Sequence, residues 1–407
     1  MPRNTLVLTG GGVLGVTYAG AFRALEEQGI QLREFEVVYG TSVGGLVGLL
    51  VVLGIHHTSI HQLLMSIPIA SFFRIHTNGI LTMADTGGID SGNGLRRLIR
   101  SVLRRVTGRS TLTLGELYQR YPVRFAVNAL DVRSGKQVIL GTQETPDIRV
   151  EDALCATSAI PGLFVPVRIN NMVLVDGGVW DALMIGQVPP EDIPYTIALS
   201  PIVQPDPPST NPDLLFILRA SFNALTTRGI LRCCEDPRYK NQIIRILTPI
   251  SPTTMLSEQA DSTSVRETLD FIGYTEVSRS TVTKDFLDRI NQPTQPSTSP
   301  PTSSIPPVTQ SQQTQPPPLT QVTQLASGSP ETPYEGDDTS RPGPDGQHSQ
   351  GEGLQPADQG DSLGSLDRTL LQHPDTPSGP SHSLPPPIDT RELGGPRVAP
   401  VAYQSRV

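Results

Sequence analysis

The chain has 407 residues and a formal charge of −8, and its composition changes near residue 290. Residues 291–407 hold 22 of the 39 prolines, no phenylalanine or tryptophan, and 5 − 12 = −7 of the charge. Such a segment cannot bury enough apolar surface to offset its chain entropy, so we predict a disordered acidic tail over 291–407. Residues 1–290 are nearly neutral and suffice for one α/β domain with a large core, and we expect no nucleic-acid partner.

Cysteine usage and hydropathy indicate an intracellular protein without a membrane-spanning segment. Cys155, Cys233 and Cys234 form neither an even disulfide framework nor a metal-ligand spacing. The first residues carry one positive charge and an apolar run too short for a secretory signal. The longest apolar stretch, 43–55, falls short of the roughly 20 residues that a membrane-spanning helix needs. We therefore expect a cytoplasmic location.

The predicted elements alternate between strands and helices. A buried strand at 5–9 leads through a glycine turn at 10–15 into a helix at 16–29, and a strand at 34–40 precedes a helix at 43–55. Further strands are predicted at 123–130, 136–140, 167–175 and 195–200, and further helices at 94–107, 113–120 and 149–157. This alternation predicts a mostly parallel sheet covered by helices on both faces.

The first glycine turn, GGGVLG, matches G-x-G-x-x-G with Gly10, Gly12 and Gly15. Between a strand and a helix this pattern is typical of dinucleotide-binding domains, and Glu34 or Glu36 lies about 20 residues further on, where a ribose-binding acid belongs. Both glutamates, however, precede the apolar part of the second strand, where that acid would follow it. A dinucleotide site stays an alternative, as does a turn that needs its glycines only for backbone geometry.

The second turn, GTSVG, places Ser42 between Gly40 and Gly44, after a strand and before a helix. This arrangement is the nucleophile elbow, in which a strained turn presents the serine at the start of the helix. The neighbouring glycine turn is well placed to supply backbone N–H groups for an oxyanion. The two turns together favour an ester hydrolase more strongly than either does alone.

We do not expect a histidine to be the base that accepts the proton of Ser42. His348, His373 and His382 lie in the predicted tail, and the helix after Ser42 carries His56, His57 and His61 away from the serine at about 1.5 Å per residue. His57 and His61 have the spacing of a helical zinc pair, but no glutamate follows His57 and no third ligand is evident, so we expect no metal.

A carboxylate is the remaining choice of base. Asp176 ends an apolar strand and is followed by Gly177 and Gly178. Asp-Gly is also common in plain hairpin turns, so this motif alone does not identify a catalytic residue. A Ser42–Asp176 dyad is chemically sensible if a partly dry site raises the proton affinity of the aspartate.

Three motifs in this order resemble the patatin-like phospholipases: Gly10-Gly11-Gly12-x-x-Gly15, Gly40-x-Ser42-x-Gly44 and Asp176-Gly177-Gly178. Residues 113–139 and 156–167 are similar to the segments that lie between the family's motifs, so the resemblance covers roughly residues 5–200. It implies a three-layer α/β/α fold and a lipid acyl hydrolase, of phospholipase A or lysophospholipase type, that needs no metal or cofactor. It also implies that Ser42 is the nucleophile, that Asp176 is the proton acceptor, and that the Gly10–Gly12 turn forms the oxyanion hole.

The chain departs from the family pattern at two places. Leu14 stands where family members often have arginine, and the sequence VWDALMI follows Gly178 in place of the usual asparagines and proline. The oxyanion donors belong to the main chain, so the first change leaves the chemistry intact. The second concerns substrate fit near Trp180.

Two surfaces remain as candidate binding sites. The helix at 94–107 has leucine, isoleucine and valine on one face and Arg96, Arg97, Arg100, Arg104 and Arg105 on the rest. It is either an ordinary surface helix or a peripheral contact with anionic lipid. The tail contains PTQP and LPPPI, which are either solvated spacers or polyproline ligands of adaptor domains in a catalytically weak scaffold. The partners of the tail are not identified by its sequence.

Overall fold

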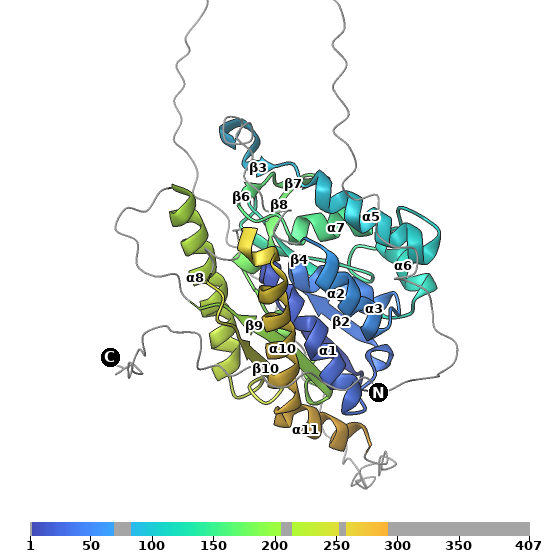
Figure 1. The fold of residues 1–407 in the computed structure, drawn as a ribbon. Helices are drawn as coiled ribbons and strands as arrows, with labels where there is room; N and C mark the ends of the chain where they lie inside the picture. The colour runs from blue at the N-terminus through green and yellow to red at the C-terminus, as the bar shows by residue number, and fades with distance from the viewer. Residues whose placement is uncertain (1, 69–82, 205–213, 252–257, 292–407) are drawn as a thin grey trace, which may run out of the picture. The chain divides into compact units, whose positions relative to one another are not determined.

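Eight strands form one mixed sheet in the computed structural model, which describes residues 2–68, 83–204, 214–251 and 258–291 (Figure 1). The predicted tail and His76 lie outside the described residues. Five strands run parallel, in the order β10 (Ile243–Leu247), β9 (Thr196–Ile202), β1 (Thr5–Leu8), β2 (Val37–Gly40) and β4 (Arg124–Asp131). Strands β5 (Lys136–Gly141) and β8 (Met172–Asp176) each pair antiparallel with β4, and β7 (Val167–Ile169) pairs antiparallel with β8. A separate small sheet pairs β3 (Gly88–Asp90) with β6 (Gly162–Phe164).

Strands β2 and β8 approach each other end to end along one side of β4. Strand β5 pairs with residues 126–131 of β4 and therefore occupies the other side. On the shared side, Gly40 at the end of β2 is opposite Val127, and Asp176 at the end of β8 is opposite Ala129. Because β2 is parallel to β4 and β8 is antiparallel, both strands end near residue 128 of β4.

Two layers cover the sheet, and together they give the three-layer α/β/α architecture that the sequence predicts. On one face α2 (Val43–Val52) lies so close that a Cβ atom at Gly48 would be 3.0 Å from the Val38 side chain. On the other face Leu183 and Ile185, in the segment that includes a 3₁₀ turn at Met184–Gln187, pack in one core cluster with Tyr39 and with Ile230 of α8 (Leu214–Glu235).

The remaining helices complete the layers. They are α1 (Thr17–Glu27), α3 (His57–Ser66), α5 (Asn93–Thr107), α6 (Leu114–Arg120), α7 (Val150–Thr157), α10 (Thr263–Ser278) and α11 (Thr281–Ile290). Helices α1 and α10 lie side by side in close contact (Figure 1), since a Cβ atom at Gly20 would be 1.9 Å from the carbonyl oxygen of Asp270. A segment more than 240 residues away along the chain thus packs on the first helix of the fold.

The predicted strand at 167–175 is wrong in one respect. It is a hairpin of β7 and β8, which turns at Asn170 and Asn171. Asn170 has φ = 52°, a left-handed conformation that asparagine tolerates better than most residues, and the two-residue turn reverses the chain. The predicted strand at 34–40 begins only at Val37, because Leu32–Glu34 form a 3₁₀ turn. The other predicted elements are confirmed to within a few residues.

Candidate active site

Ser42 occupies a strained turn between β2 and α2. Its backbone has φ = 54° and ψ = −126°, a conformation that residues other than glycine rarely adopt. Tight packing explains the glycines on either side, because a Cβ atom at Gly44 would lie 2.3 Å from the carbonyl oxygen of Leu8. The Ser42 N–H donates to Oγ1 of Thr157 at 3.0 Å, which fixes the turn against α7. The serine is 7% exposed.

Asp176 ends β8 in the interior of the domain and is 1% exposed. Its Oδ1 accepts a hydrogen bond from the Gly178 N–H at 2.7 Å. Its Oδ2 is buried and has no partner with hydrogen-bond geometry among the described residues. Burial raises the pKa of Asp176 to about 7, against the opposing effects of the Gly178 hydrogen bond and of the Ser42 hydroxyl. The carboxyl group therefore has the proton affinity of a general base that works near neutral pH.

Ser42 and Asp176 are neighbours without a well-formed hydrogen bond. The Ser42 hydroxyl is close enough to lower the pKa of the aspartate, yet Oδ2 remains unpaired by geometric criteria. The two groups are therefore close together without a hydrogen bond of good geometry. Such contacts are often long before substrate binds and tighten in the complex.

Asn128 connects the two turns that carry Ser42 and Asp176. It lies on β4 at the level where β2 and β8 end, and it is fully buried. Its Oδ1 accepts from the Thr41 hydroxyl at 2.9 Å. Its Nδ2 donates to the carbonyl oxygens of Asp181 at 2.7 Å and of Gly177 at 3.3 Å. One side chain thus holds the residue before the serine and the residue after the aspartate.

The first glycine turn contacts the serine directly. A Cβ atom at Gly10 would lie 3.1 Å from Cβ of Ser42, and Gly11 and Gly12 have φ = 146° and 55°. A Cβ atom at Gly15 would lie 2.5 Å from the Val43 side chain. These positions need glycine both for conformation and for space. Leu14, the departure from the family pattern, is buried at 1% exposure.

An apolar pocket opens beside Ser42. It encloses about 800 Å³ together with its opening to solvent. Its walls come from α2, α3, α5 and β6, and Ser158 is its one polar residue besides Ser42. Its lining is Ser42, Val43, Leu46, Val47, Leu49, Leu50, Leu63, Leu64, Ile67, Leu95, Leu98, Ile99, Val102, Ser158 and Phe164.

The histidines that the structure describes do not line this pocket. Nδ1 of His57 lies 3.5 Å from the Glu26 carboxylate, and Nε2 of His61 lies 3.4 Å from Asp270. The two histidines that were weighed as a zinc pair therefore have different carboxylate partners. Glu34 and Glu36 precede β2, at the end of the strand opposite Ser42, so the structure gives no support to the dinucleotide alternative.

Two arginines of α5 are engaged by the domain itself. Arg96 pairs with Asp152, and Nε of Arg100 lies 3.3 Å from Oε1 of the buried Glu151. Only part of the predicted basic face is therefore available to a partner. Arg97 and Arg104 are exposed. None of the described helices is long and apolar enough to cross a membrane.

Residues 6–188 match the model of a known family, described as patatin-like phospholipase. The matched range contains both glycine turns and Asp176 with its two glycines. Residues 6–188 belong to the patatin-like phospholipase family. The family resemblance seen in the three motifs is thereby confirmed, and the match ends before β9.

Two named proteins are among the relatives of this chain. It is 26% identical over 181 residues to a probable lipid hydrolase of Invertebrate iridescent virus 6, covering 44% of this chain and 60% of the relative. It is 27% identical over 203 residues to the lysophospholipase NTE1 of Meyerozyma guilliermondii, covering 48% and 12%. The chain thus spans less than two thirds of either relative. Among solved structures it is similar to VipD from Legionella pneumophila, with 14% identity, 68% and 67% coverage and a TM-score of 0.45.

Several residues of the site were not predicted from the sequence. Asn128 had a usable signal, because an amide within the apolar strand sequence RFAVNALD requires a buried hydrogen-bond partner. Thr41 and Thr157 had none, since their partners lie 87 and 115 residues away along the chain. The pocket lining from α3 was also missed, because that helix was not predicted.

Proposed function

We propose that this chain is a lipid acyl hydrolase of phospholipase A or lysophospholipase type, in which Ser42 and Asp176 form the catalytic dyad. The observation that carries the proposal is the position of Ser42, which lies between a buried aspartate with a pKa near 7 and an apolar pocket. The printed names of the relatives, a probable lipid hydrolase and a lysophospholipase, support the same class of reaction.

The proposed reaction is a two-step acyl transfer. Asp176 accepts the proton of the Ser42 hydroxyl while Oγ attacks the ester carbonyl, and the backbone N–H groups of the Gly10–Gly12 turn stabilise the oxyanion. The protonated Asp176 then donates to the leaving alcohol as the ester bond breaks. Water, deprotonated by Asp176, releases the fatty acid from the serine. This sequence of steps uses no metal ion.

The substrate class follows from the pocket. Its lining is aliphatic and aromatic apart from Ser42 and Ser158, so it suits a fatty-acyl chain whose ester carbonyl rests at the serine. Each buried methylene contributes about 0.8 kcal/mol to binding. We therefore expect medium- and long-chain esters to be cleaved with a higher kcat/KM than acetyl esters.

The test is release of fatty acid from a phospholipid, a lysophospholipid and a neutral glyceride, each of defined chain length, by the full chain. Ser42→Ala and Asp176→Asn should each lower kcat by about a thousandfold or more, and the double variant should be scarcely worse because the two residues act as a unit. Unchanged turnover by a folded Ser42→Ala protein would refute the proposal.

Part of the proposal concerns docking on lipid. The apolar face of α5 is committed to the domain, since Leu95, Ile99 and Leu103 are buried, and Leu98 lines the pocket. The exposed Arg97 and Arg104 are therefore positioned on the outside of a pocket wall. Each basic residue near an anionic membrane contributes about 1 kcal/mol to binding. We propose that these arginines bring the mouth of the pocket to anionic phospholipid.

Vesicle sedimentation tests this docking. Arg97→Glu with Arg104→Glu should weaken binding to phosphatidylserine vesicles, most at low salt, while turnover of a soluble ester stays the same. Arg279→Glu with Lys284→Glu is the matched control, because it makes the same charge change near α11, far from α5 in Figure 1. Equal loss of binding in both pairs would mean that only net charge matters.

A further inference from the structure

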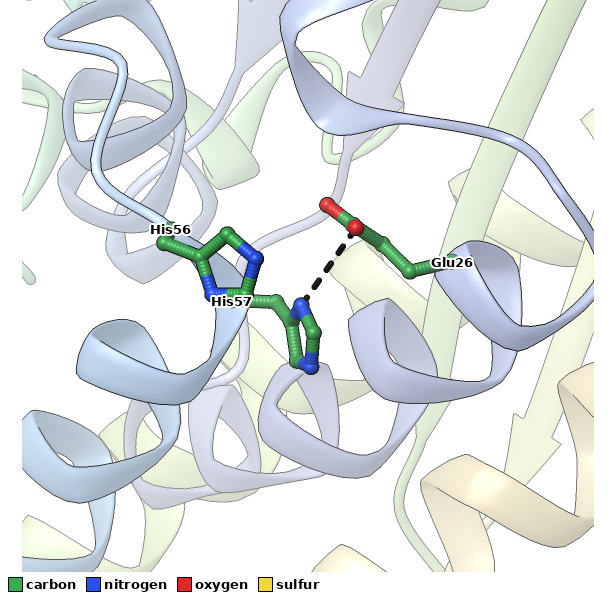
Figure 2. A group of neighbouring side chains, drawn as sticks. All are labelled: Glu26, His56 and His57. Carbon is green, nitrogen blue, oxygen red and sulfur yellow. Dashed lines mark ion pairs between the residues drawn. The ribbon is translucent and has the colours of Figure 1, made fainter. Parts of the chain in front are cut away.

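Glu26, His56 and His57 gather their ligand atoms at one place outside the proposed active site (Figure 2). One carboxylate oxygen and one ring nitrogen from each histidine lie within 4.8 Å of one another. Glu26 belongs to the last turn of α1, and the two histidines begin α3. Residues about 30 positions apart in the chain thus meet where these two helices come together.

The contact between Glu26 and His57 fits a shared ion better than a hydrogen bond. Oε2 of Glu26 lies 3.5 Å from Nδ1 of His57, and that nitrogen is buried without a hydrogen-bond partner among the described residues. Ligand atoms around a tetrahedral zinc ion, with bonds of roughly 2.1 Å, lie roughly 3.4 Å apart.

Neighbouring groups orient the other two ligands. Nδ1 of His56 lies 2.9 Å from the Thr58 hydroxyl and accepts from the Thr58 N–H at 3.4 Å. Its Nε2 is therefore the nitrogen left for a ligand, and Figure 2 shows a ring nitrogen of His56 directed toward the Glu26 carboxylate. The Leu32 N–H donates to Oε1 of Glu26 at 3.4 Å, which leaves Oε2 facing His57. Such outer contacts are typical of metal ligands.

We propose that Glu26, His56 and His57 bind a divalent transition-metal ion, with zinc as the first choice. Two imidazoles and a carboxylate are the donors of many zinc sites, and the partial exposure of His56 leaves a fourth position for water. The proposal is independent of the hydrolytic reaction, which uses no metal. Its effect would be mechanical: the ion ties the end of α1 to the start of α3, the helix whose Leu63 and Leu64 line the apolar pocket.

The same helix provides a matched control. His61 lies one turn beyond His57 and also faces a carboxylate, that of Asp270 at 3.4 Å. Asp270 is shared with Arg23 at 3.5 Å, and no third metal ligand joins this pair among the described residues. A positive guanidinium and only two donors make it a poor metal site. His61→Gln therefore removes a histidine–carboxylate pair from α3 without touching the proposed site.

The test is equilibrium dialysis of the full chain, without a histidine tag, against Zn²⁺ after treatment with a chelator. Wild type and His61→Gln should bind one more zinc ion per chain than Glu26→Gln and His57→Gln, or bind it about tenfold more tightly. Zinc should raise the midpoint of thermal unfolding of the first two proteins and leave that of the last two unchanged, because only the folded site binds.

Two results would overturn the proposal. One is equal zinc binding by wild type and both site variants. This result would place the ion at other groups, such as Cys233 and Cys234, which are consecutive in the sequence. The other is the absence of binding at micromolar zinc. Circular dichroism shows whether the variants fold. If His57→Gln does not fold, Glu26→Gln, which keeps the size and shape of the side chain, carries the test alone. Hydrolysis measured in the presence of a chelator tests the proposed function separately, because the proposed dyad needs no metal ion.

Discussion

Asp176 holds a carboxyl group where water would ordinarily be needed to solvate its charge. It is 1% exposed, and its single hydrogen bond of good geometry comes from the Gly178 N–H. Burial is the largest cause of its raised pKa, which reaches about 7. Burial also raises the pKa of Asp181, five residues further on, to about 6. Two carboxyl groups with raised pKa values thus lie at the end of β8 and in the segment that follows it.

The pH dependence of activity should report on Asp176. A general base must be ionised, so kcat/KM for a soluble ester should rise with pH and level off above an apparent pKa of about 7. The measurement is a pH profile from 5 to 9 with a substrate that does not titrate. A flat profile over this range would show that no group with such a pKa limits the reaction.

The same shift predicts an effect on stability. Because the folded-state pKa of Asp176 is raised from 3.8 to about 7, the folded protein keeps a proton that the unfolded chain releases, and stability falls as pH rises from 4 to 7. Asp176→Asn removes this loss and should raise the free energy of unfolding at pH 8 by about 1–4 kcal/mol.

At pH 4 the aspartate is neutral in the folded protein and only about half ionised in the unfolded chain, so most of this loss is absent. The Asp176→Asn variant and wild type should therefore have nearly the same free energy of unfolding at this pH. Denaturant titrations at pH 4 and pH 8 provide the comparison. The Asp176→Asn variant should keep part of the decline with pH, because Asp181 also has a raised pKa. An Asn variant that is less stable than wild type at pH 8 contradicts the burial argument.

At the scale of elements, the site depends on β4 as a common support for β2 and β8. Both strands end at its centre, and Asn128 bridges the turns that follow them. Asn128→Ala removes the 2.9 Å acceptor of the Thr41 hydroxyl and the amide donor that contacts the carbonyl groups of Asp181 and Gly177. We expect it to lower kcat about 10- to 100-fold, with little change in KM for a soluble ester, and to destabilise the domain by about 1–3 kcal/mol.

Asn171→Ala is the control for this variant, because Asn171 is an exposed asparagine in the β7–β8 turn. Its kinetics and thermal unfolding should match those of wild type. If Asn128→Ala lost stability but kept its full kcat, Asn128 would be a structural residue that does not position the dyad.

Much of the first half of the chain could be predicted because its signals are local. Glycine turns follow short apolar strands, and the two turns at residues 10–15 and 40–44 indicate the strand ends at which Ser42 lies. The antiparallel direction of β8 could not be predicted, since it depends on the turn at Asn170 and Asn171. Asp176 was selected because it ends an apolar strand. It reaches Ser42 because β8 and β2 meet end to end along β4.

Helices α3, α8, α10 and α11 were not predicted from local sequence signals. Helix α10 packs on α1 through Gly20 and Gly273, a contact that depends on two glycines about 250 residues apart. Helix α3 follows α2 closely, and no helix was predicted between residue 55 and residue 94. The proposed metal site could not be predicted from the sequence, because Glu26 and His57 come together only when α1 and α3 pack against each other.

For the whole molecule, we propose that the catalytic domain ends near residue 290, where α11 ends at Ile290. Residues 292–407 lie outside the described part of the chain. Limited proteolysis of the full chain should yield a stable core ending near residue 290, with full activity on a short-chain soluble ester. A core that loses tenfold or more of this activity would place part of the tail within the catalytic domain.

The central claim is that Ser42, activated by Asp176, carries the acyl group during hydrolysis. The most direct measurement is covalent labelling of the full chain at pH 8 with a fluorophosphonate, located by mass spectrometry of its peptides. We predict a single adduct on Ser42, none in Ser42→Ala, and labelling about 100-fold slower or more in Asp176→Asn. An adduct on another residue, or equally fast labelling of Asp176→Asn and wild type, would contradict the dyad.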